Sequence, residues 1–124
     1  MLNYLAVGIG GAMGCCARYG MTQLIQAVFG RSFPIATLVI NVLGSFILGF
    51  LFFETLERLS ISPTLRAAVL TGGLGGFTTF STFMVETLLL TEDGEISRAV
   101  MYVVLSIVLG FLAAFAGGYI ARNL

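Results

Sequence analysis

A glycine-rich run inside a long apolar segment, residues 63–90, constrains the fold of this chain most strongly. It contains the pairs Gly72-Gly73 and Gly75-Gly76 between flanks that are apolar enough for a membrane helix. Each glycine in a helix interior is less favourable than alanine by roughly 1 kcal/mol. We therefore predict a helix that is interrupted at mid-membrane. Lipid cannot bond the backbone groups freed by such a break, so the break must face protein, water or an ion.

Hydroxyl and aromatic side chains alternate directly after the glycines. The hydroxyl residues are Thr78, Thr79, Ser81 and Thr82, and the aromatic ones are Phe77, Phe80 and Phe83. Because Phe80 and Phe83 are three residues apart on a helix, both can point a ring edge at one lumen. The alternative for these rings is ordinary packing between helices. The break, the hydroxyls and the rings together predict an ion-handling site within the membrane.

Composition places the whole chain in a bilayer. Of 124 residues, 58% are hydrophobic and 10% are charged, with mean hydropathy +1.04, whereas soluble domains carry about 25% charged residues. We expect an all-α membrane protein whose single domain has four transmembrane spans, at about 2–29, 35–53, 63–90 and 96–120. The first span lacks a basic leader and is too long for a signal peptide, so it is expected to be a mature helix. Zero net charge gives no indication of nucleic-acid binding, and no ATP site or catalytic triad indicates an enzyme.

Small residues are concentrated where helices could approach closely. Gly10 and Gly14 are four residues apart in the first span, and Gly117-Gly118 lies in the last. The adjacent Cys15 and Cys16 are interpreted as small packing residues, with a redox or metal role as the alternative.

A polar stripe is predicted on the second span. Thr37, Asn41 and Ser45 follow one another at intervals of four and share a helix face. An asparagine within the membrane requires a partner for its amide. Asn41 either bonds a neighbouring helix or offers its NH₂ donors to a passing anion.

One basic and one acidic residue lie inside spans. Arg18 either extends to the membrane interface or forms the cationic mouth of an anion vestibule. Glu86 shares a helix face with Thr82, four residues earlier. Glu86 is either solvated near the interface or lines a vestibule, where its charge opposes anions unless it is paired or protonated.

The distribution of arginines barely favours either orientation of the chain in the membrane. With four spans, one side of the membrane would hold Arg58, Arg66 and Arg122, and the other Arg31, Arg98 and, where it reaches the interface, Arg18. A chain inserted in both orientations can pair as an antiparallel two-fold homodimer, which is our hypothesis for its assembly.

The residues from Gly72 to Phe83 resemble the signature of the Fluc (CrcB) family of small fluoride channels. The resemblance extends to Arg18 in a glycine-rich first span and to the Asn41–Ser45 run. It implies a dual-topology homodimer in the bacterial plasma or inner membrane, in contact with lipid, which passively exports fluoride through two pores at the subunit interface.

The resemblance also implies roles for individual residues. A structural sodium ion would lie on the dimer axis, bound by the carbonyl oxygens of Gly75 and Thr78 from both subunits. Residues of the fluoride pore would be Asn41, Phe80, Phe83, Tyr102, Thr37, Ser81 and Thr82. Arg18 matches the vestibule arginine of the family.

Two other functions are weighed against a channel. Small proton-coupled multidrug transporters are also four-span dimers, but they depend on an acid in the first span and on tryptophan. The first span here has no acid, and the chain has no Trp. A membrane assembly factor, whose glycines serve only helix packing, would pass no ions.

Overall fold

The computed structural model describes residues 1–57 and 60–124, which form helices and no strand. The elements are α1 Leu2–Phe29, α2 Ile35–Glu57, α3 Pro63–Arg66, the π-helix η1 Ala67–Leu74, α4 Gly75–Phe77, α5 Phe80–Glu92 and α6 Ile96–Arg122. The predicted segments therefore correspond to helical regions, three of which continue slightly further than expected at their C-terminal ends. Arg58, which was counted in the orientation argument, lies outside the described residues.

The third helical region begins where the sequence predicts. Ser62 accepts a hydrogen bond from the Leu65 amide on its side-chain oxygen at 3.1 Å, and Pro63 occupies the first helical position. At the other end of this region, Gly94 has a φ of 79°, a value that favours glycine, in the short turn to α6.

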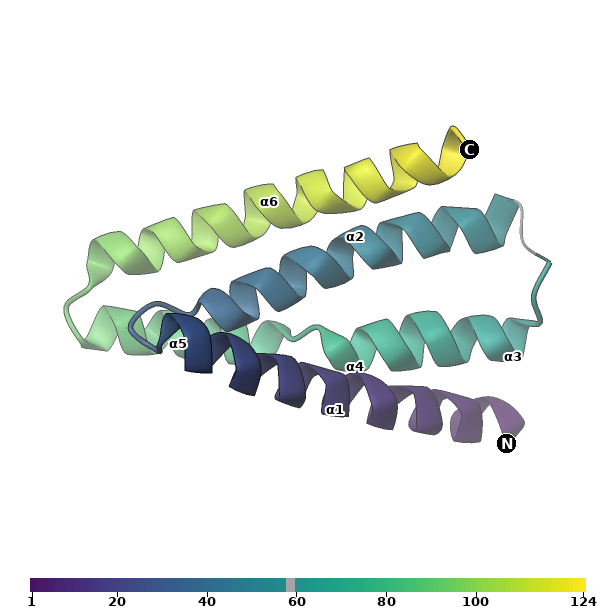
Figure 1. Ribbon diagram of the computed structural model, residues 1–124, viewed down its shortest axis with the longest axis horizontal. Helices are drawn as coiled ribbons and strands as arrows, with labels where there is room; N and C mark the ends of the chain where they lie inside the picture. Colours follow the sequence, from purple (N-terminus) through teal and green to yellow (C-terminus); the bar gives the residue numbers. More distant parts are fainter. Residues whose placement is uncertain (58–59) are drawn as a thin grey trace.

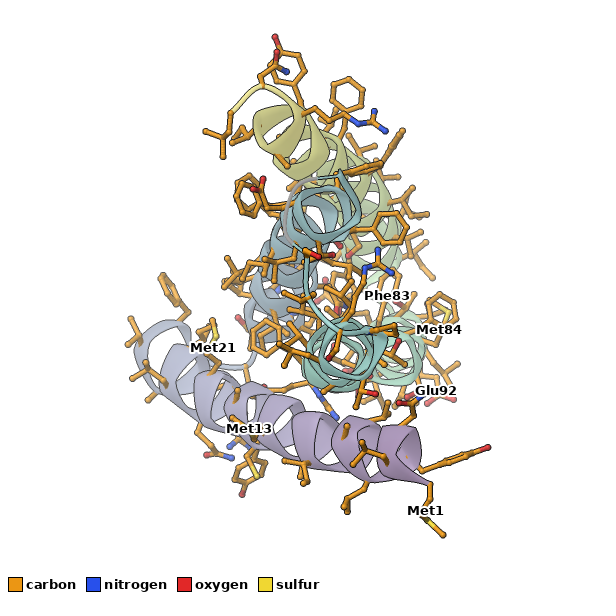
Figure 2. All side chains as sticks on the ribbon, turned by 90° about the vertical axis from the view of Figure 1, so that its right-hand side faces the viewer. Met1, Met13, Met21, Phe83, Met84 and Glu92 are labelled. Carbon is orange, nitrogen blue, oxygen red and sulfur yellow. The ribbon has the colours of Figure 1, made fainter. Side chains whose placement is uncertain are left out.

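The long helices run alternately up and down the long axis of the molecule, so the N- and C-termini lie at the same end (Figure 1). Seen end-on, they form a row with α1 at one edge and α6 at the other, and with α2 and the α3–α5 region between them (Figure 2). The accessible surface is 7601 Å², whereas a compact monomer of 13.2 kDa exposes about 6,400 Å². The chain is thus an open layer of helices and lacks the enclosed centre of a bundle.

Three segments of the described chain are long and apolar enough to cross a membrane: Ile35–Thr55, Pro63–Glu92 and Ile96–Arg122. Helix α1 has 28 residues, but it is not among these three. The multi-pass character is therefore established, while the count of four membrane spans stays a prediction.

The predicted interruption occurs in the third region, but its position differs from our expectation. Both glycine pairs are helical, and the chain leaves the helix at Thr78 and Thr79, near the middle of Pro63–Glu92. Backbone bonding is already irregular before this point, because η1 is a π-helix, which is rare and often found at functional sites.

The glycines instead allow two helices to touch. A Cβ atom on Gly10 would collide with the Ala68 carbonyl, and one on Gly14 with the Gly73 carbonyl. From the other side, a Cβ on Gly76 would lie 2.7 Å from the Gly11 carbonyl oxygen. The predicted small-residue face of the first helix is thus confirmed, and its partner is the glycine-rich run itself.

A second close contact joins α2 to α6. A Cβ on Gly117 would collide with the Phe46 carbonyl, and a Cβ on Gly118 would lie 2.9 Å from the Phe53 ring. Close approach of α6 through these glycines agrees with the sequence prediction. Other side chains of α6, including Phe111 and Phe115, remain exposed.

Candidate functional site

The interruption consists of two extended residues. Thr78 has φ −88° and ψ 159°, and Thr79 has φ −151° and ψ 124°. The Asn41 side chain bonds both backbone groups of Thr79. Its Nδ2 donates to the Thr79 carbonyl oxygen at 3.0 Å, and its Oδ1 accepts from the Thr79 amide at 2.9 Å. The helix–helix bond considered for Asn41 is therefore present, and the second Nδ2 hydrogen remains for another acceptor.

The break redirects the amides that would normally bond two upstream carbonyls. In an α-helix the Thr79 amide would bond the Gly75 carbonyl, but it bonds Asn41 instead. Likewise the Thr82 amide, the α-helical partner of the Thr78 carbonyl, donates to Thr79 Oγ1 at 3.3 Å. The carbonyls of Gly75 and Thr78 are the two that the family resemblance implies as sodium ligands, and both are without their usual α-helical donors.

A hollow of about 230 Å³ lies beside the break, which we call the Phe80 hollow. Its lining residues are Asn41, Gly44, Ser45, Leu48, Thr78, Thr79, Phe80 and Phe83. Phe83 is buried, whereas Phe80 is 71% exposed, and their rings meet edge to face at 5.9 Å between centroids. Both predicted pore phenylalanines thus border one space together with the Asn41 amide.

Glu86 is held by two hydroxyl groups. Thr37 Oγ1 donates to Glu86 Oε2 at 3.1 Å, and Tyr102 Oη donates to Glu86 Oε1 at 2.7 Å. Tyr102 is fully buried, and its ring meets Phe83 edge to face at 4.9 Å. Thr37 and Tyr102, which were predicted for the pore, therefore form one hydrogen-bonded group with Glu86, and Tyr102 joins this group to Phe83.

A second, polar cavity of about 350 Å³ lies between α1, α2 and α5, which we call the Arg18 cavity. Its lining includes Cys15, Arg18, Thr37, Thr79, Thr82 and Glu86. Arg18 Nε donates to the Gly76 carbonyl oxygen at 3.1 Å, so the guanidinium lies beside the interrupted helix. Thr82 and Glu86 line this cavity together, as their spacing predicts.

One predicted pore residue does not join the others. Ser81 is exposed on α5 and lines neither the Phe80 hollow nor the Arg18 cavity. Conversely, the structure assigns importance to the Thr79 backbone and to Phe33, whose ring meets Tyr102 edge to face at 5.6 Å. The sequence signal for Thr79 was its place in the motif, whereas nothing in the sequence indicated Phe33.

These features define a multi-pass membrane protein with polar groups gathered along an interrupted helix. Residues 5–118 match the family model described as CrcB-like protein, Camphor Resistance (CrcB), and the chain belongs to this family. The predicted family membership is thereby confirmed.

Curated relatives carry the name fluoride-specific ion channel FluC. One from Acidithiobacillus ferrooxidans is 60% identical over 111 residues, which is 90% of this chain and 89% of that protein. One from Magnetococcus marinus is 47% identical over 94% of each chain, and one from Geobacter sulfurreducens is 43% identical over the full length of both. Because this name describes ion channels, it agrees with the expectation that the chain is not an enzyme.

Proposed function

We propose that the chain is a fluoride channel that lets cytoplasmic fluoride leave the cell passively, down its electrochemical gradient. The carrying observation is the interrupted helix: Asn41 holds the break beside the Phe80 hollow, in a chain 60% identical to a protein named a fluoride-specific ion channel. Localisation in a bacterial plasma or inner membrane belongs to the same proposal.

The chemistry of the hollow suits a small, strongly hydrated anion. Fluoride must lose water to enter a narrow path, so donors along that path must replace its hydration. The remaining Nδ2 hydrogen of Asn41 is such a donor, and the edges of Phe80 and Phe83 carry positive partial charge. The hydroxyls of Thr37, Ser81 and Thr82 are proposed as a polar track, to which Thr37 would contribute once its bond to Glu86 is exchanged and Ser81 from the exposed face of α5. Arg18 is proposed as the cation that attracts the anion to this track.

The open layer of helices supports an antiparallel homodimer. Phe80 is a large ring that is 71% exposed at the site, and Gly75 is exposed on the same interrupted helix. A second copy related by a two-fold axis would cover both and bring two breaks together. The carbonyls of Gly75 and Thr78 from each copy would then bind a sodium ion, because backbone oxygens suit hard cations. Two pores would flank this ion at the interface.

We expect purified protein in liposomes to release fluoride rapidly and chloride at the background rate. Phe80→Ile is expected to reduce fluoride efflux by about two orders of magnitude, because it removes an aromatic edge that substitutes for water. The measurement is efflux recorded with a fluoride electrode. As a control, Phe111→Ile alters an exposed α6 ring away from the hollow and should leave efflux unchanged.

Equal chloride and fluoride efflux from the native protein would contradict the proposed selectivity. A requirement for a pH gradient would favour the proton-coupled transporter, and complete absence of flux would favour the assembly factor. If the Phe80→Ile variant released fluoride at the native rate, the Phe80 ring would not be part of the pore, and the proposed channel function would still stand.

The dimer axis can be tested at Gly75. A Cβ at this position would lie 3.9 Å from the Leu70 carbonyl oxygen, so the chain itself has room for a larger side chain. Gly75→Val is therefore expected to keep the helical content but to lower the dimer fraction in liposomes about tenfold by crowding the partner. Energy transfer between labelled copies measures this fraction, with Gly20→Val as the control. An unchanged dimer fraction would place Gly75 away from the interface.

A further inference from the structure

The α2 face that carries Asn41 continues past the break to the end of the helix. Beyond Asn41 and Ser45, intervals of three or four residues along α2 bring Leu48, Phe52 and Thr55 onto the same face. At the Thr37 end of this face lies the Glu86 and Tyr102 group. The Thr55 end lies at the opposite end of the molecule, near α3 and the two chain termini (Figure 1).

Arg66 is fixed at the Thr55 end of this face. Its Nε donates to Thr55 Oγ1 at 2.9 Å, and its Nη2 donates to the Phe52 carbonyl oxygen at 3.3 Å. Its guanidinium carbon also lies 4.7 Å from the centre of the Phe52 ring, a cation–π contact. These contacts use two of the five guanidinium hydrogens and hold the remaining three in a defined direction.

No described acidic side chain neutralises the charge of Arg66. Among the side chains that the structure describes, those of residues 1–55 and 60–124, no carboxylate forms an ion pair with Arg66. Arg98, at the other end of the molecule, differs in this respect because its Nε lies 3.7 Å from Glu95 Oε2. Arg66 is therefore a fixed cation with donors to spare.

A pocket of about 370 Å³ opens beside this cation, which we call the Arg66 pocket. Its polar lining comes from Thr55, Arg66 and Thr71, and its remaining walls are apolar. Thr71 is exposed on η1, between the Arg66 position and Gly75 along the interrupted region. Thr55 donates its hydroxyl hydrogen to the Leu51 carbonyl oxygen at 2.7 Å, so the donors that remain for a ligand are the Arg66 guanidinium and the Thr71 hydroxyl. A preoriented guanidinium with one hydroxyl and apolar walls is an arrangement that binds a small anion, because a low-dielectric wall strengthens attraction to the cation.

We propose that the Arg66 pocket is an anion-collecting site at the end of the fluoride path opposite Glu86 and Tyr102. Arg66 raises the local concentration of fluoride there, and the Thr71 hydroxyl contributes a hydrogen bond as the ion moves toward the Phe80 hollow. This inference rests on the proposed channel function and adds a second mouth to it. A charged mouth of this kind acts on the rate of ion capture and loses its effect in high salt.

The test compares Arg66→Gln with Arg98→Gln, which removes the same charge from the other end of the molecule. In proteoliposomes at about 10 mM ionic strength, Arg66→Gln is expected to lower fluoride efflux about tenfold, and at about 1 M the difference should shrink to about twofold. Arg98→Gln should leave efflux within twofold of native at both salt concentrations. Arg66→Lys should keep most of the low-salt rate, because it retains the charge.

A second measurement leaves the hydrogen bonds between Arg66 and α2 intact. Thr71→Cys, made in a Cys15→Ser and Cys16→Ser background, places a thiol in the pocket. A negatively charged methanethiosulfonate reagent is expected to reduce efflux at least fivefold, since it adds bulk and an opposing charge in the path.

The outcomes separate this inference from the channel function. Native protein that conducts fluoride, together with an Arg66→Gln rate equal to native at low salt, would overturn the proposed mouth and leave the channel standing. The proposed mouth would also be overturned if Arg66→Gln lost the same fraction of its efflux at low and high salt. It would be overturned as well if Thr71→Cys kept its full efflux after labelling. If the native protein itself conducts no fluoride, the channel function fails first.

Discussion

Replacing Asn41 by alanine is expected to abolish fluoride efflux and to lower the free energy of unfolding by about 2–6 kcal/mol, because each of two backbone groups left unbonded costs about 1–3 kcal/mol. The two groups are the amide and the carbonyl of Thr79, which Asn41 bonds at 2.9 and 3.0 Å. Lipid cannot bond these two backbone groups once the Asn41 side chain is removed. Unfolding in mixed micelles, followed by circular dichroism, measures the loss of stability.

The matched control is Ser45→Ala, one turn further along the same α2 face. Ser45 also lines the Phe80 hollow, but it does not bond the Thr79 backbone. We expect this variant to unfold within about 1 kcal/mol of native. Equal stability of Asn41→Ala and Ser45→Ala would show that the break is supported by other contacts.

Asn41→Asp keeps one acceptor, replaces the donors with a negative charge, and should conduct far less fluoride while the dimer persists.

The second large effect is expected at Gly14. Gly14→Leu should destabilise the fold by about 3 kcal/mol or more, because overpacking against a backbone carbonyl cannot be relieved by turning a side chain. A Cβ on Gly14 would collide with the Gly73 carbonyl, so α1 would have to move away from η1. The loss should appear as aggregation during purification or as a lowered midpoint of unfolding.

Gly20→Leu provides the comparison for this change. It lies on the same helix, and a Cβ there would meet nothing within 4 Å. Because leucine is a better helix former than glycine, this variant should be as stable as native or slightly more stable. If Gly14→Leu matched Gly20→Leu in stability, the contact between α1 and η1 would contribute little to the fold.

The glycine-rich run shows how far sequence reasoning reached. An interruption in the third helical region was predicted and is present, but the glycines were assigned the wrong role. Glycine lowers helix propensity, yet it also lets two backbones touch, and propensity is a weak effect that packing overrides. Gly73 and Gly76 therefore stay helical against α1, and the chain breaks at Thr78 and Thr79.

In the candidate site, too, some features follow from the sequence and others depend on how the helices pack. The i, i+4 relation of Thr82 and Glu86 and the shared border of Phe80 and Phe83 follow from helical spacing, which acts within one segment. The bonds from Thr37 and Tyr102 to Glu86 join three separate helices. Contacts of this kind depend on the relative placement of helices, which residue spacing alone does not encode.

The order of residues alone is enough to predict a helical membrane protein with an irregular third helical region and a polar stripe on the second helix. These properties depend on hydrophobicity, periodicity and local backbone preference, all of which act over a few consecutive residues. The position of the break depends on packing between helices, because the Asn41 side chain on α2 must bond the Thr79 backbone for extended residues to persist there. Packing also holds Arg66, which the sequence offered only for the orientation argument, over Phe52 beside a pocket.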